Sequence, residues 1–84
     1  MTIAFTEAAW EDYSYWLRVD REKVDRIHQL LKDITRDTFK GIGKPEPLKN
    51  KLAGLWSRRI DSEHRLVYKI ERNTVFVTQC RYHY

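Results

Sequence analysis

The chain has 84 residues, of which 42% are hydrophobic and 33% charged, and a formal net charge of +4. This composition excludes a largely disordered chain, and we expect residues 1–84 to form one soluble domain with a small, aromatic-rich core. No apolar run approaches the roughly 20 residues of a membrane span, there is no secretory signal, and the single cysteine cannot form an internal disulfide; these features favour the cytoplasm.

The N-terminal segment predicts a short strand followed by a helix. Residues 3–5 are apolar, and Thr6 is a plausible N-cap with Glu7 in the first helical turn. Hydrophobic residues at helical spacing then predict the buried face: Trp10, Tyr13 and Leu17. The opposite face is expected to be solvated, with Glu7, Glu11, Asp12 and Arg18.

A second helix is predicted to begin at Asp20. Its hydrophobic residues repeat at spacings of three and four, with Leu30 widening the stripe: Val24, Ile27, Leu31 and Ile34. This pattern is typical of an amphipathic helix that packs one face on a core. We expect the two helices to form an antiparallel pair.

The periodicity disappears over residues 39–54, where glycines and prolines break any regular element. A loop of about 15 residues is better explained by a function than by connection alone. Residues 40–59 hold six Lys or Arg and a single acid, Glu46, whereas residues 1–39 hold six Lys or Arg and eight Asp or Glu. This segregation suggests a polyanion partner that meets one face of the domain.

The final third predicts a meander of three antiparallel strands, residues 55–60, 65–70 and 74–83. With residues 3–5 joining the same sheet, the predicted fold is α+β: two N-terminal helices packed on a twisted antiparallel sheet. Alternation along the last strand predicts that Cys80 and Tyr82 are buried while Arg81 and His83 share the opposite face. The remaining large aromatic residues are assigned to the core: Trp10, Trp16, Trp56 and Tyr68.

The acids and histidines do not form a metal-binding motif. The three histidines lie far apart, at positions 28, 64 and 83, and no Cys or His pair has ligand spacing. The glycines of residues 41–45 lead into an irregular stretch instead of a helix N-terminus, which argues against a phosphate-binding loop. We therefore expect neither a metal nor another cofactor.

A different set of residues has the chemistry of phosphodiester cleavage. Glu46 stands alone in the basic loop, where nearby lysines would stabilise its carboxylate, and a histidine such as His83 can give or take a proton. Cleavage needs a group that deprotonates the attacking 2′-hydroxyl, one that protonates the leaving 5′-oxygen, and fixed positive charge for the phosphate. The other candidates of this set are Lys44, Lys49, Arg59, Arg65, Arg81 and Tyr84.

Each candidate also has an ordinary structural interpretation. Loop acids are usually solvated, and cations are common on the exposed face of a sheet. The same loop would bind phosphates without cutting if the domain were a non-catalytic RNA- or ribosome-binding module. A third possibility is that the domain serves mainly as the partner-binding subunit of a regulatory complex.

Four segments in combination resemble one family: GKPEPLK, WSRRI, EHRLVY and the terminal CRYHY. They are similar to the YoeB toxins of bacterial toxin-antitoxin systems, within the wider RelE superfamily, and the resemblance runs over the whole chain. It implies a microbial-ribonuclease-like fold and a ribosome-dependent endonuclease that cuts mRNA in the A site of the 70S ribosome. It also implies a homodimer, neutralisation by a YefM-like antitoxin, and binding of operator DNA only through the toxin-antitoxin complex.

The resemblance also implies roles for individual residues. Glu46 matches the general base, His83 the general acid, and Arg65 the cation that stabilises the transition-state phosphate. Further phosphate contacts and a substrate-orienting group are implied at Lys49, Arg59 and Tyr84.

Overall fold

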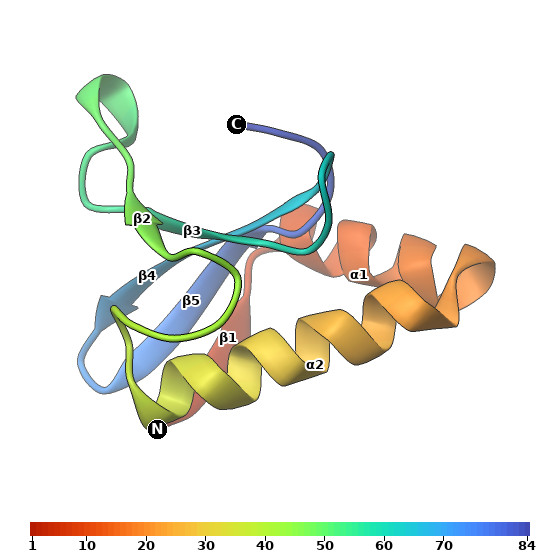
Figure 1. Ribbon diagram of the computed structural model, residues 1–84, viewed down its shortest axis with the longest axis horizontal. Helices are drawn as coiled ribbons and strands as arrows, with labels where there is room; N and C mark the ends of the chain where they lie inside the picture. The colour runs from red at the N-terminus through yellow and green to blue at the C-terminus, as the bar shows by residue number, and fades with distance from the viewer.

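The computed structural model describes residues 1–84 and consists of a pair of helices packed on a five-stranded sheet (Figure 1). The helices are α1 (Glu7–Val19) and α2 (Arg21–Arg36). The strands are β1 (Thr2–Phe5), β2 (Glu46–Pro47), β3 (Trp56–Arg59), β4 (Arg65–Glu71) and β5 (Thr74–Gln79), and a short 3-10 helix covers Asn50–Leu52. Neither α-helix combines the length and the apolar character needed to cross a membrane.

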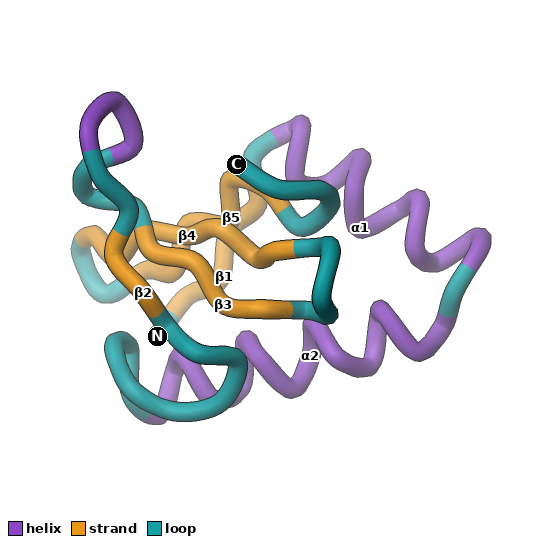
Figure 2. Tube along the Cα trace, turned by 45° about the horizontal axis from the view of Figure 1, so that its top comes forward, coloured by secondary structure: helices purple, strands orange, loops and turns teal.

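The strand order β1-β5-β4-β3-β2 confirms the predicted α+β class and adds one detail (Figure 2). Strands β2 to β5 are antiparallel, as predicted, but β1 runs parallel to β5, with Ile3 opposite Val75 and Phe5 opposite Val77. A strand that enters the sheet before the helices is not joined to its neighbour by a hairpin, so antiparallel pairing is not imposed on it. The sheet is therefore mixed at one edge.

Helix α2 has the core face that its sequence predicts, with five buried side chains: Val24, Ile27, Leu30, Leu31 and Ile34. Asp20 both ends α1 and begins α2. Its backbone N–H donates to the carbonyl of Trp16 at 2.9 Å, and its carboxylate accepts from the N–H of Glu22 at 3.1 Å. The two helices therefore join through one residue and run antiparallel across one face of the sheet (Figure 1).

Helix α1 begins as predicted, because the Thr6 hydroxyl accepts from the N–H of Ala9 at 3.1 Å. Its predicted core face is wrong for Trp10 and Leu17, which are 54% and 45% exposed, whereas Tyr13 packs against the core. Ala9 and Trp16, two turns apart, are the buried residues, as predicted for Trp16. Trp10 stacks on Tyr13 with their ring centroids 5.5 Å apart, so the apolar repeat marks the rim of the core and not its centre.

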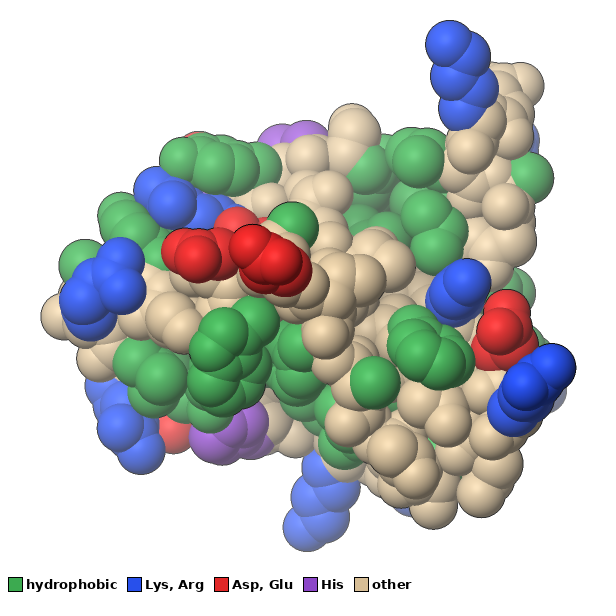
Figure 3. All heavy atoms as spheres, turned by 180° about the vertical axis from the view of Figure 1, so that it is seen from behind, with side chains coloured by type: hydrophobic (Ala, Val, Ile, Leu, Met, Phe, Trp, Pro, Cys, Tyr) green, Lys and Arg blue, Asp and Glu red, His purple; other side chains and the backbone are tan.

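Hydrophobic side chains gather beside a histidine on the helical part of the surface seen from behind (Figure 3). They surround a shallow hollow of about 340 Å³. Trp10 is exposed because it lines this hollow. The lining residues are Ile3, Phe5, Trp10, Tyr13, His28 and Leu31.

The last strand is shorter than predicted. Strand β5 ends at Gln79, and Cys80–Tyr84, hereafter the terminal segment, leaves the sheet. Helix α1 diverts the chain here: the indole N–H of Trp16 donates to the carbonyl of Cys80 at 2.9 Å, and the carboxylate of Asp12 accepts its N–H at 3.0 Å. Cys80 is buried as predicted, but Tyr82, predicted to be buried, is 53% exposed. Asp12 was predicted to be solvated, but its carboxylate accepts the hydrogen bond from the Cys80 N–H.

The connection from α2 to β3 is mostly irregular, as predicted, but it contains the outermost strand. Glu46 pairs with Ser57 and Pro47 with Trp56. A proline is tolerated at this edge because its missing N–H faces no further strand. The predicted catalytic acid is thereby hydrogen-bonded into the sheet and does not lie on a free loop.

Candidate active site

Antiparallel pairing places a row of side chains across the sheet face that points away from the helices. Glu46 lies opposite Ser57, Ser57 opposite Val67, and Val67 opposite Gln79. Directly opposed residues share a face, whereas the alternate residues, such as Leu66, are buried in the core against the helices. One continuous face therefore links β2, β3, β4 and β5, and the end of the chain lies across the sheet from α2 (Figure 1).

Two predicted cations lie side by side on this face. Arg59 and Arg65 are directly opposed in β3 and β4, two residues along from the row just described. Arg65 is buried, and its Nη1 donates to the carbonyls of Asp61 at 2.8 Å and His64 at 3.1 Å, whereas Arg59 is exposed. Opposed like charges destabilise a strand pair, so a bound anion would relieve their repulsion. The pair has the positive charge that a phosphate contact requires.

Glu46 and Tyr84 meet although they are 38 residues apart. The Tyr84 hydroxyl donates to Oε1 of Glu46, and the Ser57 hydroxyl lies 3.5 Å from the Tyr84 oxygen. This contact borders a cleft of about 310 Å³ that Lys49 also lines. The other lining residues are hydrophobic or amide side chains: Pro47, Leu48, Asn50 and Leu52. A carboxylate, a phenol and an ammonium group thus converge on one concave surface.

The remaining predicted site residues are not part of the lining of this cleft. Lys44 is exposed two residues before Glu46, with its backbone in the left-handed region at φ 51°. His83 is exposed in the terminal segment, next to Tyr84. Arg81 is directed elsewhere: its guanidinium carbon lies 3.4 Å from the ring centroid of Tyr15 on α1, in a cation-π contact. Arg81 stays a prediction as a substrate contact.

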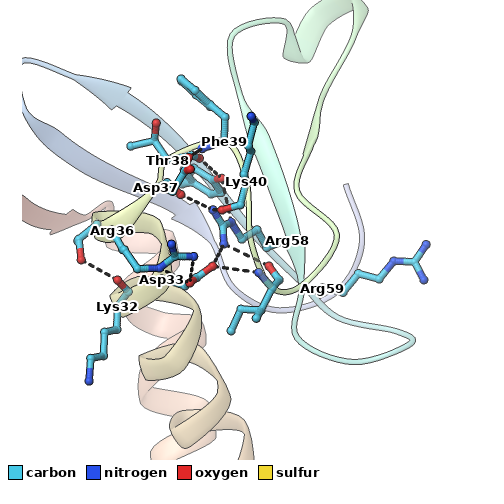
Figure 4. Close-up of polar contacts among 12 residues, drawn as sticks. Lys32, Asp33, Arg36, Asp37, Thr38, Phe39, Lys40, Arg58 and Arg59 are labelled. Atoms are coloured by element: carbon cyan, nitrogen blue, oxygen red, sulfur yellow. Dashed lines mark hydrogen bonds and ion pairs between the residues drawn. The ribbon is translucent and has the colours of Figure 1, made fainter.

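Arg58 is the buried anchor of the loop that leads into β2 (Figure 4). Although it belongs to the predicted basic stretch, its side chain is fully buried and adds no positive charge to the surface. Its guanidinium donates to the carbonyls of Asp37 at 2.8 Å, Lys40 at 3.0 Å and Ile42 at 3.2 Å, and to the carboxylate of Asp33 at 2.6 Å. These bonds fasten the loop to β3 and so fix where β2 begins.

Asp33 completes this anchor from α2. Hydrogen bonds from Arg36, from the backbone N–H of Ile42 and from Arg58 lower the pKa of the Asp33 carboxyl to about 2. The loop also approaches the core closely at Gly43, whose φ is 80° and where an added Cβ would lie 2.8 Å from a methyl of Leu30. Ion pair and glycine together hold the loop in one path.

Sequence reasoning missed three polar groups of this region: Ser57, His64 and Gln79. Strict alternation along β5 would place Gln79 on the same face as the buried Val75 and Val77, and only the register shift between Val67 and Tyr68 brings it to the opposite face. Nothing in the sequence singles out Ser57, or distinguishes His64 from an ordinary turn residue. No group of three or more His, Cys, Asp or Glu side chains comes together in a metal-binding arrangement.

Known proteins are similar to the chain over its whole length. The family described as the YoeB-like toxin of bacterial type II toxin-antitoxin systems matches residues 5–84. The toxin YoeB of Streptomyces coelicolor is 56% identical over 84 residues, which is 100% of both chains. The structure of a YoeB/ParE toxin from Agrobacterium tumefaciens matches with a TM-score of 0.98 and 45% identity, again over 100% of both chains.

YoeB of Staphylococcus aureus is similar in two further structures. Its dimer matches with a TM-score of 0.94 and 47% identity, and its complex with YefM with 0.93 and 46%. Each match covers 100% of this chain and 98% of the other. These similarities confirm the resemblance first drawn from four short segments. The chain belongs to the YoeB-like toxins of bacterial type II toxin-antitoxin systems.

Proposed function

We propose that this toxin acts in the cytoplasm as a ribosome-dependent endoribonuclease that cuts mRNA in the A site of the 70S ribosome and so inhibits translation. The observation that carries the proposal is the convergence of Glu46, Lys49 and Tyr84 on one cleft. The sheet face that presents Glu46 also presents the opposed pair of Arg59 and Arg65. A base, a hydroxyl donor and fixed cations are the groups that phosphodiester cleavage uses.

The proposed reaction is an in-line attack of the 2′-oxygen on the adjacent phosphorus. The Glu46 carboxylate takes the proton of the 2′-hydroxyl, and the oxygen forms the new bond to phosphorus. The imidazolium of His83 gives its proton to the departing 5′-oxygen. The products are a 2′,3′-cyclic phosphate and a 5′-hydroxyl, and Arg65 and Arg59 stabilise the charge that gathers on the phosphate oxygens.

The cleft is about 310 Å³ and is lined by only seven residues. We propose that alignment of the 2′-oxygen, the phosphorus and the 5′-oxygen comes from the ribosome, which presents the message in a fixed path. Positioning of this kind contributes several kcal/mol to lowering a barrier. Isolated toxin that cuts naked mRNA as fast as ribosome-bound mRNA would contradict this part of the proposal.

The catalytic proposal is tested with Glu46→Ala and His83→Ala on ribosome-bound mRNA, with Glu11→Ala on the exposed face of α1 as the control. Each catalytic variant is expected to lose about 10²-fold or more in cleavage rate, because a positioned acid or base contributes about that much. A 2′-deoxy sugar at the cut site should abolish cleavage. A domain that only binds RNA or the ribosome would keep its effect on translation in both variants.

We further propose that the toxin forms a homodimer and is neutralised by a YefM-like antitoxin, with operator DNA bound only through that complex and repressing its own transcription. The support is similarity to the Staphylococcus aureus protein, whose structures are a YoeB dimer and a YoeB-YefM complex. Light scattering on the purified chain tests the dimer. Co-expression with a small acidic protein encoded beside it tests neutralisation, and continued toxicity would count against the pairing.

A further inference from the structure

The terminal segment carries two of the proposed catalytic residues, His83 and Tyr84, yet it belongs to no strand or helix. Within it, the backbone of Tyr82 lies in the left-handed region at φ 63°. A residue with a side chain adopts this conformation at a cost, and keeps it only where its surroundings impose it. The groups that hydrogen-bond to Tyr82 and its neighbours impose this conformation.

His64 holds the amide of Tyr82. Nδ1 of the imidazole accepts the backbone N–H of Tyr82 at 2.8 Å, and the N–H of the next residue, Arg65, donates to the carbonyl of Tyr82 at 3.0 Å. The His64 ring is only 8% exposed and meets the Trp16 ring edge-on, with centroids 4.8 Å apart. The terminal segment is thus bound through both backbone groups of Tyr82, its N–H to His64 and its carbonyl to Arg65, the first residue of β4.

The bond to Tyr82 determines which ring nitrogen of His64 acts as the acceptor. A ring nitrogen that accepts an N–H carries no proton, so the remaining proton belongs on Nε2, which lies 3.5 Å from a carboxylate oxygen of Glu63. The other groups packed around the ring are Trp16, which carries no charge, and Tyr82 itself. With Nδ1 occupied and the ring buried, His64 is not available to an RNA substrate.

Gln79 holds the same segment from the end of β5. Its side-chain nitrogen lies 2.8 Å from the carbonyl oxygen of Arg81, 3.3 Å from that of Tyr82 and 2.7 Å from that of His83. Both hydrogens of the amide are therefore directed into the terminal segment. Since Gln79 belongs to the row that begins at Glu46, it fixes the segment over the face that bears the cleft.

We propose that His64 and Gln79 are positioning residues that hold the terminal segment in one path, so that His83 and Tyr84 are presented beside Glu46. This inference rests on the proposed ribonuclease function. The two residues secure the segment at Tyr82 and His83, and the contact between Tyr84 and Glu46 secures its end. Without them the chain beyond Cys80 samples many orientations, and few of these place the general acid in line with the leaving oxygen.

The structural part of the test uses NMR on the intact toxin at neutral pH. The ¹⁵N shifts of His64 should show an unprotonated Nδ1 and a protonated Nε2, and the amide of Tyr82 should exchange slowly. In His64→Phe, which keeps a ring but has no acceptor, that amide should exchange about tenfold faster or more. His64→Asn, which places an oxygen near the position of Nδ1, should restore most of the protection.

The kinetic part measures kcat and KM separately on ribosome-bound mRNA. His64→Phe and Gln79→Glu, which is isosteric but cannot donate, should each lower kcat about tenfold or more and leave KM within about twofold. His64→Asn should recover much of the kcat. Gln29→Glu, the same change at an exposed position of α2, is the matched control and should leave both constants unchanged.

Several outcomes overturn the inference. A Tyr82 amide that exchanges rapidly in the wild-type toxin would do so, as would wild-type kcat in both His64→Phe and Gln79→Glu. If His64→Phe does not fold, Gln79→Glu decides the question by itself. Cleavage that survives Glu46→Ala would instead refute the proposed reaction, and the amide exchange would still decide whether His64 holds the segment.

Discussion

Replacement of Arg58 by methionine should remove much of the free energy of unfolding of this domain, whereas the same change at Arg59 should not. The two arginines are adjacent in one strand, but Arg58 is fully buried and Arg59 is exposed. Methionine is unbranched like the aliphatic part of arginine, fills only that part of the space, and has no donor. Comparing Arg58→Met with Arg59→Met therefore distinguishes the effect of losing a buried cation from the effect of losing a surface cation.

The magnitude follows from the contacts of Arg58. Its loss leaves the carbonyls of Asp37, Lys40 and Ile42 without their donor and deprives the Asp33 carboxylate of its buried partner. Leaving a buried hydrogen-bonding group without its partner costs about 1–3 kcal/mol, so loss of the three carbonyl bonds together is expected to cost about 3 kcal/mol or more. An 84-residue domain has about 4–12 kcal/mol of stability in total, and each kcal/mol shifts the midpoint by about 4–8 °C.

Thermal unfolding at a fixed protein concentration, followed by tryptophan fluorescence, measures both variants. Arg58→Met is expected to melt at least about 12 °C below the wild type, and Arg59→Met within a few degrees of it. Equal shifts for the two variants would refute the reasoning, because they would mean that the bonds of Arg58 to the loop carry no net stabilisation.

Three further predictions concern single side chains. Tyr84→Phe removes the hydroxyl that donates to Glu46 and should lower cleavage of ribosome-bound mRNA about tenfold without changing the melting temperature. Hydrogen bonds from Arg36 and its neighbours hold the pKa of Asp33 at about 2, so its ionised form stabilises the fold above about pH 4 and that stabilisation is lost toward pH 2. In Asp33→Asn the free energy of unfolding should therefore fall less steeply between about pH 4 and pH 2 than in the wild type. An unaltered pH dependence would argue against a lowered pKa for Asp33. Burial raises the pKa of the Cys80 thiol to about 12, so alkylation at pH 8 should be slow in the native protein and fast in denaturant; rapid native labelling would show that the terminal segment opens readily.

Local patterns predicted the helices well where one element buries one face. The stripe of α2 is strictly periodic and all five of its hydrophobic positions are buried, because a helix that lies flat on a sheet needs one continuous apolar face. Helix α1 crosses the edge of the same core and buries only Ala9 and Trp16. Its periodicity could not reveal which part of the stripe would face the sheet and which part the rim.

In the candidate site, too, the sequence identified residues but not their positions in space. Glu46, Arg65 and Tyr84 were identifiable by residue type and by the resemblance to a family. Strand alternation alone could not place Tyr84 beside Glu46, since it extends β5 four residues too far. The chain leaves the sheet at Cys80 because Trp16 and Asp12, far away in sequence, satisfy the hydrogen bonds of its peptide groups.

The sequence by itself determined the class of this protein: the order of the two helices and of four of the five strands, the basic loop with its single acid, and the family. The tertiary structure alone decided which of two adjacent arginines is exposed, since alternation assigns Arg58 and Arg59 to opposite faces without saying which face the helices cover. It also decided the course of the terminal segment. That course depends on contacts between residues up to 71 positions apart, and such long-range contacts leave no local pattern in the sequence.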